Sequence, residues 1–193
     1  LPFHEPYRLA SAWAAIEAAL LLGVAQEQLR ERLRSFRGLP HRMETLAVPA
    51  PFRVVNNGVA THPEPTEAAL RHTDGPVVLL AGGKDKGLPL EGLASATQRC
   101  ARVYLHGAGG ARLARACAEH AVAAREFNTS REAFDAALEE LLPGETLLYS
   151  PSFASFDEYR NFRDRATVFL DACRRILGRR APVSVAPGSA ETR

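Results

Sequence analysis

Short runs of apolar and β-branched residues alternate with longer amphipathic stretches from about residue 43 onward. The apolar runs predict β-strands over residues 52–56, 77–81, 103–106 and 146–149. The stretches between and after them predict helices over residues 65–72, 90–100, 111–119, 130–141 and 158–177. Strands that alternate with helices of about ten residues are typical of βαβ units. The pattern therefore predicts an α/β fold with a mostly parallel sheet and helices on both of its faces.

A different pattern precedes this alternation. Apolar residues recur at three- and four-residue spacings over residues 7–22, and Gly23 follows at a usual helix stop position. A second helix is predicted over residues 26–35. Two such helices cannot bury their apolar faces alone, so we expect them to pack on the rest of the chain or on a partner. We divide the chain into an all-helical segment with a linker (residues 1–42), an α/β domain (43–178) and a tail rich in proline, alanine, serine and glycine (179–193), which we expect to be disordered.

The composition narrows the class of protein. Hydrophobic residues make up 46% of the 193 positions and charged residues 24%, as in ordinary globular domains. The apolar runs fall short of the roughly 18 residues that a membrane helix needs, so we expect no membrane insertion. The net charge of +2 is too balanced to indicate nucleic acid as a partner. We see no signal peptide, and the three widely spaced cysteines indicate neither a disulfide framework nor a zinc site, so we expect a cytoplasmic location.

The clearest candidate for a ligand site is the segment Gly-Gly-Lys-Asp-Lys-Gly at residues 82–87, which follows the second predicted strand. In parallel sheets, ligands bind beyond the carboxyl ends of the strands. The glycines let the backbone approach a ligand closely, and Lys84 and Lys86 are the only lysines in the chain. The segment suits a carboxylate or a phosphate, although a tight turn with solvated lysines has the same spacing. It is not a Walker A motif, because the G-x-x-x-x-G-K-[ST] spacing is absent.

Three further segments place polar groups at loop positions. The loop Asn-Asn-Gly-Val-Ala-Thr-His at residues 56–62 offers hydrogen-bonding groups, and by itself it is also an ordinary turn. The segment Ser-Pro-Ser-Phe-Ala-Ser-Phe-Asp at residues 150–157 places hydroxyls before a helix, although Ser155 and Glu158 also fit a capping box. The basic pair at residues 41–42 is suited to a nucleotide phosphate or base, or else it is a surface pair on a loop.

Taken in order, the segments at residues 38–42, 57–61, 82–87, 150–157 and 162–165 resemble the Mur ligase family. The resemblance covers nearly the whole chain up to about residue 177. It implies a Rossmann-like C-terminal ligase domain, preceded by the helical end of the family's central ATPase domain. It also implies an ATP-dependent carboxylate–amine ligase that activates UDP-MurNAc-L-alanine as an acyl phosphate and joins it to D-glutamate in peptidoglycan biosynthesis. The implied cofactors are ATP and Mg²⁺, both bound mostly by other parts of such a ligase.

The resemblance also implies roles for single positions. Lys86 matches the family lysine that pairs with a carboxylate of D-glutamate, and Thr61 matches a threonine near the same site; both are expected to serve binding and catalysis. Ser155 and Phe156 match the residues that hold the second carboxylate, and Phe162 matches the ring that closes the pocket. A dianionic amino acid does require a cation and several fixed donors. The implied nucleotide-binding positions are Arg42, His41, Asn57 and Arg8.

The sequence departs from the family pattern on the nucleotide side. Asn57 stands where the family has an acidic residue, and Val59 stands where it has a lysine. Near the start, only His4 of a His-Asn-x-x-Asn pattern is retained, and Arg8 occupies an asparagine position. The sequence contains neither the UDP-binding domain nor a phosphate loop, so we expect one part of a catalytic unit that the N-terminal and central ligase domains complete. The alternatives are a degenerate Mur-ligase-like module that binds without catalysis and a purely structural domain without a carboxylate ligand.

Overall fold

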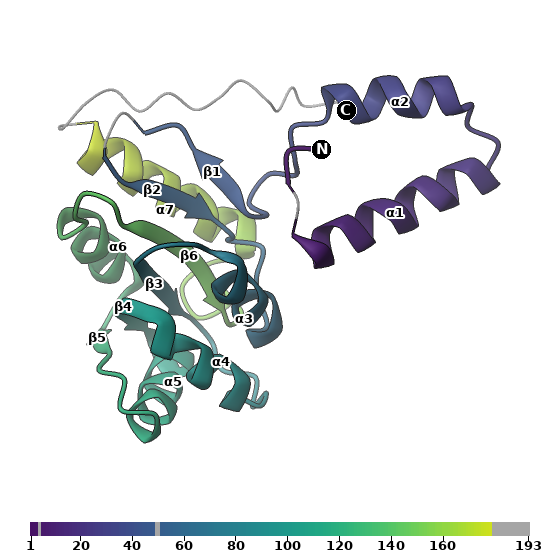
Figure 1. Cartoon of the computed structure of the whole chain (residues 1–193). Helices are drawn as coiled ribbons and strands as arrows, with labels where there is room; N and C mark the ends of the chain where they lie inside the picture. The colour runs from purple at the N-terminus through teal and green to yellow at the C-terminus, as the bar shows by residue number, and fades with distance from the viewer. Residues whose placement is uncertain (4, 49–50, 179–193) are drawn as a thin grey trace. The chain divides into compact units, whose positions relative to one another are not determined.

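A computed structural model of the chain describes residues 1–3, 5–48 and 51–178 (Figure 1). These residues form two compact units, Leu1–Pro40 and the part from His41 onward. The tail at residues 179–193, for which we predict disorder, lies outside the described residues, and so does His4. Among the described helices, none combines the length and the apolar character that a bilayer span requires.

The first unit contains two helices, α1 (Pro6–Leu21) and α2 (Gln26–Ser35), which confirms both predicted helices to within one residue. A proline opens α1, where a missing backbone amide leaves no hydrogen bond unmade. Neither helix has a buried residue, and Trp13 is 63% exposed. The two helices therefore do not bury their apolar faces against each other, as expected for a pair of this size.

The second unit is built on a six-stranded sheet in the order β1-β2-β6-β3-β4-β5. Strands β1 and β2 pair antiparallel, and all other neighbours are parallel. The four predicted strands are present, whereas the hydrophobic pattern does not predict β1 and β5, because each spans only three residues. The strands are β1 (Glu44–Leu46), β2 (Arg53–Asn56), β3 (Val77–Gly82), β4 (Cys100–His106), β5 (Arg125–Phe127) and β6 (Thr146–Ser152).

Helices cover both faces of the sheet, as predicted (Figure 1). Alternate residues of β3 show this, because successive side chains of a strand point to opposite faces. Val78 and Leu80 pack in the core that α6 and α7 close, whereas Leu79 packs in the core that α3, α4 and α5 close. The helical elements are α3 (Pro63–His72), α4 (Glu91–Ala96), the 3-10 turn η1 (Thr97–Arg99), α5 (Gly107–Glu119), α6 (Ser130–Glu139) and α7 (Phe162–Leu177).

The last helix begins four residues later than its sequence pattern predicts. Asn161 caps α7, since its side-chain oxygen accepts hydrogen bonds from the amides of Arg163 and Asp164 at 2.9 and 3.0 Å. The capping box suggested for Ser155 and Glu158 is therefore wrong. The Glu158 carboxylate instead accepts from the first residue of α6. The segment between β6 and α7 is left as a loop at the sheet edge, where the candidate site lies.

Candidate functional site

The carboxyl ends of β2, β6 and β3 lie side by side, because these strands are parallel neighbours. The loops that follow them therefore meet at one edge of the sheet. Gly82 and Gly83 let the end of β3 pack closely against the backbone of His106 and Ala154. A Cβ at Gly82 would lie 2.2 Å from the carbonyl oxygen of His106, and one at Gly83 would lie 2.3 Å from that of Ala154. Only glycine fits at these two positions, because the protein's own backbone occupies the space that a side chain would need.

The structure brings Lys86 and Thr61 together at this edge. The ammonium nitrogen of Lys86 donates a hydrogen bond to the carbonyl oxygen of Thr61 at 3.1 Å. Lys86 is exposed, and within the described residues its charge pairs with no carboxylate. Both residues line a small surface hollow, which is formed by Thr61, Pro63, Asp85, Lys86, Leu88, Ser152 and Phe153.

The carboxylate next to Lys86 in the chain is held by a different cation. A guanidinium nitrogen of Arg112 bonds Asp85, and the amide of Gly87 donates to the same oxygen at 3.0 Å. The Arg112 hydrogen bond lowers the pKa of Asp85. Arg112 also donates to the carbonyl of Leu88, which fixes the loop after β3. Because Asp85 is occupied by Arg112, the ammonium of Lys86 remains available to an anion from solvent.

The other residues expected to bind D-glutamate do not line this hollow. Ser155 is 2% exposed, and its carbonyl accepts from the amide of Tyr159 at 2.9 Å. The ring of Phe156 is 66% exposed. Phe162 opens α7 and is half-buried. The end of β6 contributes Ser152 to the hollow instead, and the loop that follows contributes Phe153.

Sequence reasoning missed Ser152, whose position is set by the backbone. Its φ of 68° is uncommon for a residue other than glycine. Its hydroxyl donates to Thr66 at 2.8 Å, and the Thr66 and Ser150 hydroxyls lie 2.6 Å apart. Asn57 completes this buried network by donating to Ser150 at 2.9 Å. The Asn57 side chain, which we expect at the nucleotide, is therefore part of a buried hydrogen-bond network beneath the loops. The only signal for this network in the sequence is the concentration of small polar residues in these segments.

A buried arginine fastens the loop after β6 to the end of β3. Arg165 is fully buried, and its guanidinium donates to the carbonyl oxygens of Gly82, Ala154 and Phe153 at 3.3, 3.1 and 3.0 Å. No carboxylate shares this guanidinium among the residues that the structure describes. The resemblance includes Arg165 in its last segment but implies no role for it.

Glu158, which belongs to the loop after β6, holds this loop against α6. Its carboxylate accepts from the amide of Ser130 at 3.0 Å and from the Ser130 hydroxyl at 2.8 Å. The His106 imidazole beside it and these donors lower the pKa of Glu158 to about 2. This loop is therefore anchored on both sides, at β3 and at α6.

The residues expected at the nucleotide come from both compact units. His41 has a φ of 60°, and its Nδ1 accepts a hydrogen bond from the side-chain amide of Asn56 at 3.0 Å. Burial lowers the pKa of His41, and the nearby Glu44 opposes this shift. Arg42 is exposed. Arg8 belongs to the first unit, where it pairs with Glu5 at 3.2 Å.

A mostly parallel sheet with helices on both faces defines an α/β domain, and the exposed Lys86 lies beside a small hollow at the carboxyl edge of that sheet. The family model described as Mur ligase, glutamate ligase domain, matches residues 41–153. The chain belongs to this family, which confirms the resemblance seen in its motifs.

Several curated relatives carry the name UDP-N-acetylmuramoylalanine–D-glutamate ligase. The relative from Lacticaseibacillus paracasei is 33% identical over 171 residues, which cover 88% of this chain and 37% of the relative. That from Aromatoleum aromaticum is 38% identical over 175 residues, which cover 90% of this chain and 37% of the relative. The chain thus spans less than half the length of the relatives it matches.

Solved structures with the same fold include two larger enzymes. MurF from Acinetobacter baumannii superposes with a TM-score of 0.64 at 19% identity, over 89% of this chain and 39% of that one. FolC from Escherichia coli, in complex with ADP, superposes with a TM-score of 0.64 at 22% identity, over 91% and 41%. At these identities the likeness concerns the fold, and it confirms the predicted α/β class.

Proposed function

We propose that the chain is the amino-acid-binding C-terminal part of a MurD-type ligase. Such an enzyme is an ATP-dependent carboxylate–amine ligase that adds D-glutamate to UDP-MurNAc-L-alanine during peptidoglycan biosynthesis in the cytoplasm. ATP converts the alanine carboxylate to an acyl phosphate, the amine of D-glutamate attacks its carbonyl carbon, and phosphate leaves. The relatives that share the name UDP-N-acetylmuramoylalanine–D-glutamate ligase support this substrate pair.

One observation carries the proposal, and it is the exposed ammonium of Lys86 beside Thr61 in the hollow. A carboxylate of D-glutamate would bind this ammonium by a charge-assisted hydrogen bond. The second carboxylate would be received by the loop after β6 through Ser155 and Phe156, with the Phe162 ring closing the pocket. Because these three residues do not line the hollow of Lys86, this part of the proposal requires the loop to adjust around the amino acid.

We further propose that residues 1–42 are the helical end of the central ATPase domain and that residues 43–178 are the ligase domain. The UDP-binding domain and the remainder of the ATPase domain would be the partners of this chain. Arg42 suits a phosphate of ATP, because it is exposed and has no ion pair within the described part of the chain. ATP and Mg²⁺ would be held mostly by the other domains, with His41 and Arg8 as further nucleotide contacts.

A second candidate function rests on Val59. This half-buried valine occupies the position of the family lysine and offers no donor to a developing phosphate charge. Asn57, two residues earlier, donates its side-chain amide to the buried hydroxyl of Ser150. A chain with this nucleotide side would bind the amino acid or a partner protein without catalysing the ligation.

The test uses a chimaera in which this chain replaces the corresponding part of the Aromatoleum aromaticum relative. Phosphate release is measured with ATP and UDP-MurNAc-L-alanine as the D-glutamate concentration is varied. Loss of a hydrogen bond to a charged group costs about 1.5–3 kcal/mol, so Lys86→Ala should raise the KM for D-glutamate by at least tenfold. Lys84→Ala is the matched control, since Lys84 is exposed and only its backbone bonds Ala154.

Equal KM values for the two lysine variants would refute the assignment of Lys86. If the unmodified chimaera releases no phosphate, Val59→Lys separates the two functions. Activity restored by Val59→Lys supports the binding module, provided that the chain itself still binds D-glutamate in an NMR titration. The absence of D-glutamate binding to the chain and the chimaera alike would exclude the ligase function and a binding module for the amino acid.

A further inference from the structure

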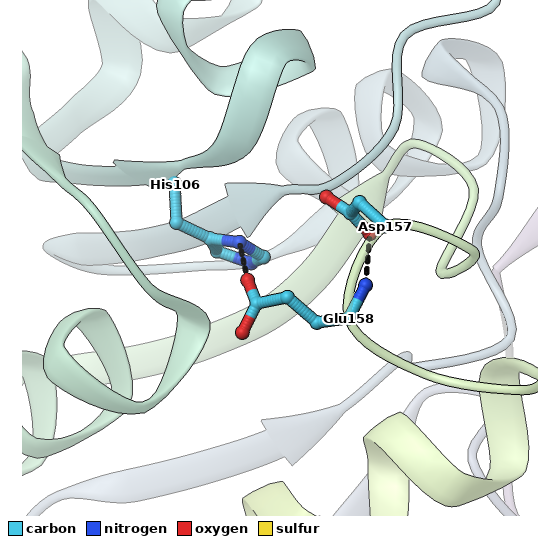
Figure 2. Close-up of side chains that lie close together, drawn as sticks. All are labelled: His106, Asp157 and Glu158. Carbon is cyan, nitrogen blue, oxygen red and sulfur yellow. Dashed lines mark hydrogen bonds and ion pairs between the residues drawn. The ribbon is translucent and has the colours of Figure 1, made fainter.

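A histidine and two carboxylates lie together at the edge of the sheet (Figure 2). None of the three lines the hollow that holds Lys86. His106 is the last residue of β4, and Asp157 and Glu158 belong to the loop before α7. One nitrogen or oxygen from each of the three side chains lies within 4.8 Å of the other two. The proposed binding of D-glutamate uses none of the three.

The imidazole of His106 is buried, and it makes an ion pair with Glu158 but no hydrogen bond within the described residues. The residue is 2% exposed, and neither ring nitrogen has a hydrogen-bond partner in the described part of the chain. Its Nδ1 lies 3.5 Å from a carboxylate oxygen of Glu158, and Figure 2 shows the ring facing that carboxylate. Buried polar side chains are nearly always hydrogen-bonded or coordinated in native proteins. The ring therefore points to a partner that lies between it and the carboxylates.

The two carboxylates are already oriented for such a partner. Glu158 is fixed by the backbone amide and the hydroxyl of Ser130. One oxygen of Asp157 accepts from the Glu158 amide at 3.1 Å. Hydrogen bonds of this kind commonly orient the ligands of a metal ion. Both acidic residues are exposed, so an ion can enter from solvent.

The distances agree with metal ligation. Bonds of about 2.1 Å at a tetrahedral ion separate two ligand atoms by roughly 3.4 Å. His106 Nδ1 and Glu158 Oε1 are 3.5 Å apart. The Asp157 carboxylate needs to move by roughly 1 Å to complete the set, which an exposed side chain does readily. An imidazole in the set favours first-row transition ions over Mg²⁺ and Ca²⁺, which prefer oxygen ligands alone.

We propose that His106, Asp157 and Glu158 bind a divalent transition-metal ion of the Mn²⁺ to Zn²⁺ class. Water fills the remaining coordination positions. The ion joins the end of β4 to the loop between β6 and α7, and so restrains the loop that carries Ser155 and Phe156. This site is separate from the Mg²⁺ that accompanies ATP, and it does not depend on the ligase function.

Mn²⁺ is the probe, because it has little affinity for the three cysteine thiols. Free Mn²⁺ is measured by electron paramagnetic resonance as the ion is added to the purified chain. His106→Asn and Glu158→Gln should each weaken binding at least tenfold. His120→Asn is the matched control, since His120 pairs with Glu91 at 3.2 Å and belongs to no three-residue cluster among the described residues. It should leave the affinity unchanged.

Glu158→Gln is the decisive variant, because it alters an exposed side chain and need not disturb the core. Mn²⁺ should raise the unfolding temperature of the unaltered chain and should not raise that of Glu158→Gln. Millimolar Mn²⁺ that neither binds nor stabilises the folded chain overturns the proposal. Glu158→Gln that binds Mn²⁺ as tightly as the unaltered chain overturns it as well. Neither result bears on the Lys86 test, which measures D-glutamate.

Discussion

Replacing Arg165 with methionine tests how the loop after β6 is held in place. Three hydrogen bonds link the buried guanidinium to backbone carbonyls of β3 and of this loop. A hydrogen bond from a charged donor contributes about 1.5–3 kcal/mol. Burial of an ion costs several kcal/mol, which methionine avoids. The carbonyls left without a donor outweigh this gain, so we expect Arg165→Met to lower the free energy of unfolding by about 3 kcal/mol.

Urea unfolding followed by circular dichroism measures this loss directly. A change of about 3 kcal/mol corresponds to a fall of roughly 10 °C in Tm for a domain of this size. Arg160→Met is the control, because the Arg160 side chain is 89% exposed and pairs only with Asp164, at 2.8 Å. Such a surface pair contributes less than about 1 kcal/mol. Arg165→Lys should fall between the two, since an ammonium keeps the charge without the planar fork of donors.

A loss for Arg165→Met no larger than that for Arg160→Met would refute this reasoning. It would mean that the three carbonyls find other donors or that the cost of burying the guanidinium cancels its hydrogen bonds. In the chimaeric ligase, Arg165→Lys should also raise the KM for D-glutamate, because the loop that carries Ser155 loses part of its anchor. An unaltered KM would show that Arg165 supports the fold alone.

Two further predictions concern a glycine and a surface carboxylate. Gly82→Ala should lower the free energy of unfolding by more than about 3 kcal/mol, because its Cβ would meet backbone at 2.2 Å and φ is 143°. Gly87→Ala, with open space and a φ of 71°, should cost about 1 kcal/mol; equal losses in urea unfolding would contradict the close approach. Hydrogen bonds from Tyr104, and then from Arg125, lower the pKa of Glu140. The resulting stabilisation is fully present above the ordinary pKa of 4.5 and is lost as the pH falls through the lower folded value. The stability of Glu140→Gln should therefore fall less in this acid range, and parallel Tm profiles for both proteins would contradict the assignment.

The regular part of the fold follows from local pattern. Residues 77–81 are all apolar and all buried, and such a run in a parallel sheet reads as a strand without further information. Strand β1 lacks this signal, since it spans only three residues, of which only Leu46 is buried, and it pairs with β2 alone. The predicted start of α7 is wrong for a related reason. Glu158 fits a local capping pattern, yet its carboxylate bonds Ser130, which is 28 residues away in the chain.

The residues of the candidate site also divide into those that the sequence predicts and those that only the structure reveals. Lys86 and Thr61 were predictable because the family motifs mark them, and the structure brings them together. Ser152 was not predictable, since its place in the hollow depends on a left-handed backbone and on a buried hydroxyl partner. For Asn57, the nucleotide contact stays a prediction. Its position in the motif predicts a nucleotide contact, whereas its side chain donates to Ser150 in the interior.

The arrangement around Lys86 favours the proposed ligand site over a structural turn. In a structural turn, the nearest acidic residue would pair with the lysine and so lower the cost of clustering charge. Here Asp85 is taken by Arg112, which also holds the Leu88 carbonyl, and Lys86 contacts a carbonyl oxygen of the neighbouring loop instead. A free ammonium held at a fixed place adds little to stability, because surface charge interactions are weak. It adds much to the binding of an anion, because the cation is already in position when the ligand arrives.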